Sequence, residues 1–167
     1  MPVLNIAMVG SDDLAREIAK PTDQRDVHTY VHKESGADGP RILSIIRPAK
    51  YPERLRPFLN ALSAARVGII EVQRIDATLG EALVAFASSG LTKGMAIINA
   101  PEGEWVDEEQ AKMLFKQAGL ADWTFAQGDG IELRTILYGF MDDIADELRA
   151  NAEAPLVIPV DQYFNVK

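Results

Sequence analysis

The sequence has no cysteine, no long hydrophobic run and fewer basic than acidic residues, and each absence excludes a class of function. Without cysteine there are no disulfides, thiolate metal sites or cysteine nucleophiles. No apolar run approaches the roughly 18 residues of a membrane-spanning helix, and the start has no basic signal-peptide region. With 17 Lys and Arg against 25 Asp and Glu, the net charge of −8 argues against a broad nucleic-acid-binding surface. We therefore expect a soluble cytoplasmic domain that binds no membrane.

Apolar residues are abundant instead, at 47% of 167 residues, which suits one globular domain. The near-continuous apolar runs Val3–Val9, Val67–Val72 and 95–99 are typical of parallel strands covered by helices on both faces. Alternation of such strands with helices predicts an α/β fold, a three-layer sandwich with a mostly parallel sheet. Helices are expected at 14–20, 55–62, 78–90 with Thr78 in a capping box, 107–119 and 133–148, a hairpin at 26–46 and a short strand at 122–126.

The turn after the first strand stands where a phosphate-binding loop would stand. Such a loop reads G-x-x-x-x-G-K-[ST], because glycines let backbone N–H groups surround the phosphates, lysine neutralises them and the hydroxyl holds magnesium. In that register the chain has Gly10, then Ala15, Arg16 and Glu17. The turn therefore has the position of a phosphate-binding loop without most of its chemistry.

Two acidic residues, Asp12 and Asp13, follow Gly10 in the expected first helical turn, where they would repel a triphosphate. We interpret this segment as an ordinary strand–helix turn with Ser11 as the N-cap. Paired acids after a first strand also occur in receiver-type phosphoacceptor domains. That alternative needs an aspartate at the end of a central strand, whereas the corresponding strands here end at Val72 and Asn99.

Three segments carry a resemblance to a known family: 158–167 (IPVDQYFNVK), 94–99 (GMAIIN) and 128–133 (GDGIEL). With the order of elements, they resemble translational GTPases of the elongation factor Tu type, closest to the archaeal selenocysteine-elongation-factor-like branch. The resemblance spans essentially the whole chain and implies a P-loop NTPase (G-domain)-like fold. It implies a GTPase-like α/β domain at 1–154, and a linker with the start of a following β-barrel domain at 155–167.

The nucleotide-binding and catalytic motifs of that family match this sequence less well than the three segments above do. Its magnesium-contacting D-x-x-G falls on 47–50, so that Arg47 puts a cation where a metal-bound carboxylate is required, and its water-orienting histidine falls on Tyr51. Its guanine-reading N-K-x-D falls on 99–102, which keeps Asn99, loses the lysine and replaces aspartate by Glu102. We expect no catalytic residues and no metal ligands.

The resemblance implies two groups of site residues. Asn99 and Glu102 also fit purely structural roles, as a strand cap and a loop residue. The cluster of basic residues within 47–56 also fits a solvated face whose charges pair with neighbouring carboxylates. His28 and His32 share a strand face without a third metal ligand and are interpreted as solvated. The remnant nucleotide-binding candidates are Gly10, Arg16, Asn99, Glu102 and Thr124, and the candidates for phosphate or partner contact are Arg47, Lys50, Arg54 and Arg56.

The sequence thus predicts a translation elongation factor-like G domain without GTPase activity, in a factor that binds aminoacyl-tRNA and the ribosome. GTP is the ligand that the family implies, but the replaced motif residues predict no resident cofactor. Two alternatives stay open. One is an active GTP-binding elongation factor with divergent motifs, and the other is an α/β ligand-binding domain unrelated to translation.

Overall fold

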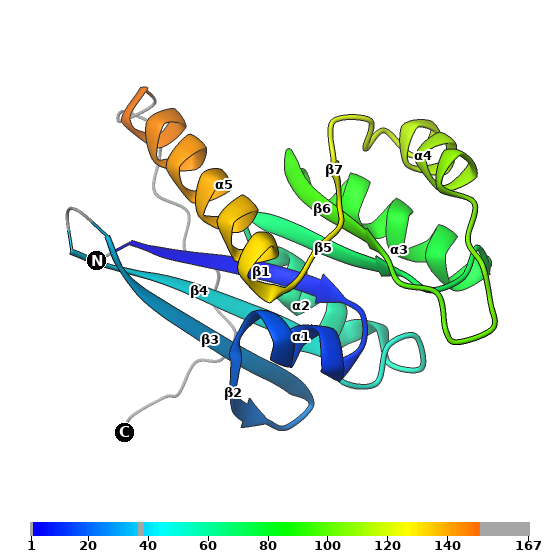
Figure 1. The fold of residues 1–167 in the computed structure, drawn as a ribbon, viewed down its shortest axis with the longest axis horizontal. Helices are drawn as coiled ribbons and strands as arrows, with labels where there is room; N and C mark the ends of the chain where they lie inside the picture. Colours follow the sequence, from blue (N-terminus) through cyan, green and yellow to red (C-terminus); the bar gives the residue numbers. More distant parts are fainter. Residues whose placement is uncertain (1, 37–38, 151–167) are drawn as a thin grey trace, which may run out of the picture.

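A computed structural model of the chain describes residues 2–36 and 39–150 (Figure 1). The segment 155–167, predicted as a linker and the start of a β-barrel domain, lies outside the described residues. Within the described part of the chain, no helix is long and apolar enough to cross a membrane.

The described residues form a seven-stranded sheet in the order β2-β3-β4-β1-β5-β6-β7. Four of its six strand pairs are parallel, and β2 and β3 are the antiparallel additions at one edge. This confirms the predicted α/β class with a mostly parallel sheet. The strands are β1 (Val3–Val9), β2 (Lys20–Gln24), β3 (Val27–Gly36), β4 (Gly39–Pro48), β5 (Val67–Val72), β6 (Lys93–Ile98) and β7 (Thr124–Ala126).

The first strand is central, as its continuous apolar pattern predicts. In the register of the sheet, Ile6 of β1 lies opposite Ile45 of β4 on one side and Val67 of β5 on the other. All three side chains are buried, because a parallel strand in the middle of such a sheet is covered on both faces. The carboxyl ends of β1, β5 and β6 therefore meet at one edge of the sheet.

Helices cover both faces of the sheet and complete the three layers (Figure 1). One core lies under α1 (Asp12–Ile18) and α5 (Gly130–Ala150), which bury Ile18 and Leu137 against β1 and β4. The second core lies under α2 (Leu55–Ala64), α3 (Ala77–Ser88) and α4 (Glu108–Gln117), with Phe58, Phe86 and Phe115 in contact with the opposite face. The predicted sandwich is thus confirmed in both of its helical layers.

Two glycines make room for a buried tryptophan in the second core. A Cβ on Gly94 would lie 2.2 Å from the Trp123 ring, and one on Gly68 would lie 2.5 Å from it. The indole therefore lies directly against the backbones of β5 and β6, and the side chain is 5% exposed. Its Nε1 has no hydrogen-bond partner among the described residues.

Two local predictions were wrong at the level of single elements. The first helix ends at Ile18, and Lys20–Gln24 forms the edge strand β2, in which Thr22 Oγ1 lies 2.8 Å from Thr29 Oγ1 of β3. All five residues of β2 are exposed, so the strand has no apolar pattern to predict it. In α3 the cap is Asp76, whose Oδ1 accepts from the Leu79 amide at 2.9 Å, and Thr78 lies inside the helix.

Candidate functional site

The turn between β1 and α1 lies at the carboxyl edge of the sheet, where ligands bind in open α/β folds. Ser11 is the N-cap of α1 and accepts from the Leu14 amide at 3.2 Å, which confirms the interpretation of this residue from the sequence. A Cβ on Gly10 would lie only 2.8 Å from Glu71 Cβ. Gly10 is therefore required by the close approach of β5 to the turn.

The carboxylate of Glu71, near the end of β5, binds directly to this turn. Its Oε2 accepts from the Ser11 amide at 2.5 Å, and its Oε1 accepts from the Ser11 hydroxyl at 3.1 Å. Glu71 is 6% exposed and is the one buried charged side chain among the described residues. An anion of the protein itself thus takes the backbone donor that a phosphate-binding loop would offer to a ligand.

The predicted candidate Asn99 joins the same cluster from the end of β6. Its Nδ2 donates to Glu71 Oε1 at 2.7 Å, so three neighbouring strand ends are connected through one carboxylate. The Asn99 side chain is thereby turned toward β5. Hydrogen bonds to a charged group contribute more to stability than neutral ones, especially where water is excluded.

Arg47 approaches the turn from β4. Its Nε donates to the Gly10 carbonyl at 2.6 Å, and its Nη1 lies 3.4 Å from Nδ1 of His28, which is opposite it in the β3–β4 register. The guanidinium therefore contacts the turn, and the Arg47 side chain is partly buried. A fixed positive charge occupies the region where the family resemblance would place a metal-bound carboxylate.

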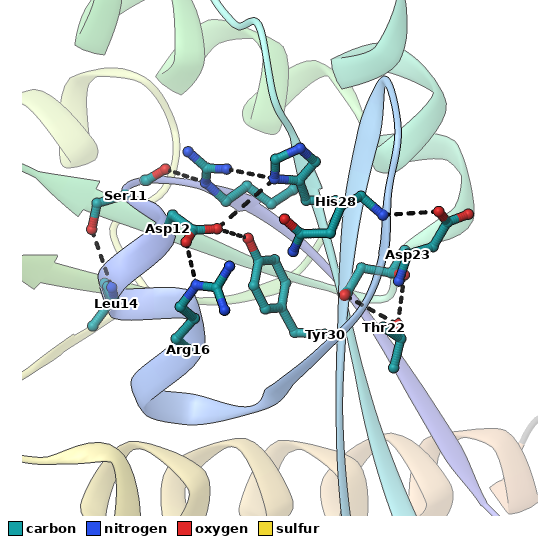
Figure 2. Close-up of polar contacts among 12 residues, drawn as sticks. Ser11, Asp12, Leu14, Arg16, Thr22, Asp23, His28 and Tyr30 are labelled. Atoms are coloured by element: carbon teal, nitrogen blue, oxygen red, sulfur yellow. Dashed lines mark hydrogen bonds and ion pairs between the residues drawn. The ribbon is translucent and has the colours of Figure 1, made fainter.

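Asp12 is the centre of a second polar network, which Figure 2 shows beside the turn. Its carboxylate accepts from the Tyr30 hydroxyl and from Nε of Arg16, and His28 Nδ1 lies 3.8 Å from its Oδ1. The hydrogen bond from Tyr30, and then that from Arg16, hold the pKa of Asp12 below its ordinary value. Burial, with the Asp12 contact added, raises the pKa of Tyr30, so the phenol stays protonated as the donor.

This network engages the predicted candidate Arg16. Hydrogen bonding to Asp12 raises the pKa of Arg16, and the two side chains form an i, i+4 ion pair on α1. Its guanidinium thus neutralises a carboxylate of its own helix. The remaining two nucleotide-binding candidates lie elsewhere: Glu102 is exposed in the loop between β6 and α4, and Thr124 is half-buried in β7 opposite Met95.

The other basic candidates are on the surface. Lys50, Arg54 and Arg56 are all exposed, and Nη1 of Arg54 lies 3.5 Å from Asp26. Only Arg47 of the predicted cluster reaches the turn, because it alone belongs to β4. Tyr51 packs its ring on Phe58 at 4.6 Å between centroids.

A cleft of about 330 Å³ opens beside the turn, between the sheet edge and the start of α3. Its apolar lining includes Val9, Ile70 and Leu79, and its charged lining includes Glu71 and Asp76. The cleft is large enough for a small ligand. Within the described residues, no group of three or more His, Asp or Glu side chains is placed to hold a metal ion.

Sequence reasoning missed Glu71 and Tyr30 as members of these networks. A signal existed for Glu71, since it is the single charged residue inside the apolar run of β5, and buried carboxylates are rarely unpaired. No local sequence pattern identifies Tyr30, because its contact with Asp12 depends on the pairing of β3 with β4.

Comparison with known proteins adds to this geometry. No protein-family model matches the chain. An uncharacterized protein of Methanocaldococcus jannaschii, MJ0325, is 23% identical over 168 residues, covering all of this chain and 50% of the relative. A bacterial selenocysteine-specific elongation factor, EF-Sec, matches in structure with a TM-score of 0.58 and 16% identity, over 92% of this chain and 29% of the factor.

The structural match and the strand order define the class of the domain, which is an α/β fold like that of the matched part of the elongation factor. At 16% identity the likeness establishes the fold alone. The chain spans half the length of the curated relative and less than a third of the elongation factor.

Proposed function

We propose that this chain is a translation elongation factor-like G domain that neither hydrolyses GTP nor binds it in the magnesium-dependent way, and that it serves as a platform in a longer cytoplasmic factor. The observation that carries the proposal is the contact of the Glu71 carboxylate with the Ser11 amide and hydroxyl. A nucleotide phosphate would have to displace this buried carboxylate and would then lie beside it.

The electrostatics around the turn support the same proposal. Phosphoryl transfer depends on a lysine, a metal and a positioned water, all arranged around the phosphates. Here Arg47 is bound to the Gly10 carbonyl and Arg16 to Asp12, so neither cation is directed to a ligand. Glu17 stands in place of the hydroxyl that would hold magnesium and adds a negative charge.

Calorimetric titration of magnesium-GTP into this chain tests the proposal directly. We expect no binding in the micromolar range and no phosphate release. Titration of magnesium chloride alone is the control for heats of dilution and for metal binding. Micromolar affinity that is lost on adding a magnesium chelator would overturn the proposal and favour an active GTP-binding elongation factor with a divergent site.

For the longer factor, we propose contact with aminoacyl-tRNA or ribosomal RNA through the exposed basic residues Lys50, Arg54 and Arg56. They are exposed basic residues close together in the sequence of an otherwise acidic protein, and Arg54 also contacts Asp26. The double variant Lys50→Glu/Arg56→Glu in the full-length factor should weaken binding of aminoacyl-tRNA and flatten its salt dependence. The exposed Arg66, at the amino end of β5, offers the control Arg66→Glu, which is matched in charge change to Arg56→Glu alone. Unchanged affinity and salt slope in the double variant would contradict this role.

The cleft beside the turn favours a second candidate, an α/β domain that binds a small ligand outside translation. Its charged lining consists of Glu71, Asp76 and Arg74, and the arginine is paired with Glu104. The two candidates separate in one experiment. Binding of aminoacyl-tRNA by the full-length factor supports the first, and thermal stabilisation of this chain by a small cationic metabolite, without RNA binding, supports the second.

A further inference from the structure

The loop between β6 and α4 carries the most exposed large apolar side chain among the described residues, Trp105, at 81% exposure. In Figure 1 this loop projects at the edge of the molecule opposite α5. The other tryptophan, Trp123, lies in the core. An indole left in water gives up the large burial free energy that aromatic side chains otherwise contribute, so an exposed tryptophan is a candidate contact residue.

The backbone on both sides of Trp105 is held in place. On one side the Glu104 amide donates to the Pro101 carbonyl at 2.9 Å, and the Glu104 carboxylate accepts a two-point contact from Arg74, with Nε to Oε2 at 2.6 Å. On the other side Val106 is 7% exposed in the second core. Asp107 then caps α4 by accepting from the Glu109 amide at 2.9 Å.

This anchoring matters for binding, because a side chain on an ordered loop loses less conformational entropy when a partner covers it. Tryptophan is also among the residues that dominate binding energy at the centres of protein interfaces. Trp105 is thus presented by a loop whose shape is fixed from within the domain.

The charge around Trp105 selects the partner. Residues 101–110 contain five carboxylates and no Lys or Arg. Arg74 pairs with Glu104, and Lys112 pairs with Glu108 and Glu109, so these two cations offset part of this charge and leave the segment net negative. Such a surface repels nucleic-acid phosphates and anionic lipids, and a second copy of this chain would bring a net charge of −8.

We propose that residues 101–110 form a docking surface for a basic protein, with Trp105 as its anchor. An arginine of the partner stacks on the indole, where cation–π attraction is strongest for this ring, and further cations of the partner meet the carboxylates around it. The loop reaches the cleft beside the turn after β1 through Pro101, but Trp105 is not among the residues that line that cleft. The magnesium-GTP titration therefore does not test the indole, and either result leaves the role of Trp105 unchanged.

The probe for this surface is a synthetic nine-residue arginine peptide, titrated into this chain with tryptophan fluorescence and calorimetry as readouts. Trp105→Ala keeps the net charge, so a loss of affinity in this variant reports the indole and not general attraction between opposite charges. Val84→Ala, at a 63% exposed position on α3, is the matched control for removal of a surface apolar group.

We expect saturable binding that Trp105→Ala weakens at least about tenfold and Val84→Ala leaves unchanged, with an unaltered thermal transition in both variants. Equal affinity of Trp105→Ala for the peptide would overturn the proposal, since net charge would then account for the binding. Trp105-dependent binding of tRNA, or Trp105-dependent dimerisation in sedimentation velocity, would also overturn it by assigning the surface to another occupant.

Discussion

The turn after β1 and the loop after β6 lie at the same edge of the sheet, with β5 between the two strands. They differ in what they leave exposed for a partner to bind. In the first, Glu71 and Arg47 approach from other strands and bind the Ser11 amide and the Gly10 carbonyl. In the second, Glu104 and Asp107 make internal contacts that hold the loop, while the Trp105 side chain is exposed to the solvent.

A G-domain-like fold binds its ligand at the turn after the first strand. In this chain that turn is already in contact with other side chains, whereas the loop after β6 has an exposed side chain that a partner can bind. A turn whose donor and acceptor are already satisfied by side chains from neighbouring strands gains little from a ligand, because each new contact replaces an existing one. A loop with a fixed backbone and an exposed indole loses little on binding. The following variants test this contrast, from the largest expected effect to the smallest.

Among the variants of the turn and of the loop, Glu71→Ala should produce the largest effect. It leaves the Ser11 amide and the Asn99 side chain without their buried acceptor and opens a cavity, so we expect a loss of about 3 kcal/mol in the free energy of unfolding. Urea denaturation followed by circular dichroism measures it. Glu102→Ala in the exposed loop is the control, with an expected change within about 0.5 kcal/mol. Similar stability of the two variants would remove the distinction between the turn and the loop.

Arg47→Met should be the next most damaging change. It keeps the aliphatic part of the side chain but removes the charged donor to the Gly10 carbonyl, at an expected cost of about 1.5 kcal/mol. The exposed Arg56 provides the control Arg56→Met, which should be neutral within about 0.5 kcal/mol. If both variants unfold at the same urea concentration as the original chain, Arg47 does not hold the turn.

Acidification tests the network around Asp12. The pKa of Asp12 is lower in the folded protein than in the unfolded chain. As the pH falls, the unfolded chain therefore takes up a proton at Asp12 before the folded protein does. The stabilisation is present above the unfolded pKa, about 3.9, and is lost as the pH falls through the folded one. Asp12→Asn should be less stable than the original chain at neutral pH and should lose less stability in acid. Parallel stability curves from pH 6 to pH 2.5 would show that Asp12 contributes no such linkage.

Trp105→Ala should have the smallest effect on folding. At 81% exposure the indole buries little area, so the free energy of unfolding should change by no more than about 0.5 kcal/mol. Trp123→Ala is the contrasting variant and should cost about 4 kcal/mol, because that ring fills the space over Gly68 and Gly94. A large loss of stability in Trp105→Ala would mean that the loop depends on the indole for its shape.

Much of the fold could be predicted because the signals for it are local. The apolar runs of β1, β5 and β6 and the helical periodicity of α2 and α5 report burial on one or both faces, and the structure confirms all five elements. The edge strand β2 could not be predicted. Its five residues are exposed, and its formation depends on backbone pairing with β3.

The candidate site was predicted less completely, since its side chains come from distant parts of the sequence. Comparison with the phosphate-loop pattern gave the position of Gly10 and the replacements at Arg16 and Glu17. It could not give Glu71, which is 60 positions from Ser11 and meets it only because β5 lies beside β1. The role of Arg47 likewise depends on the position of β4 on the other side of β1.

The sequence by itself determined the alternation of strands and helices and the absence, in the turn after the first strand, of the lysine and hydroxyl residues of a phosphate-binding loop. Both follow from residue identity and spacing along the chain, because burial and charge are properties of single positions and of their near neighbours. Only the tertiary structure decided which side chains contact the turn after β1. Strand order brings the carboxylate of Glu71 and the guanidinium of Arg47 to one turn. It also leaves the Trp105 side chain exposed to the solvent on the loop after β6.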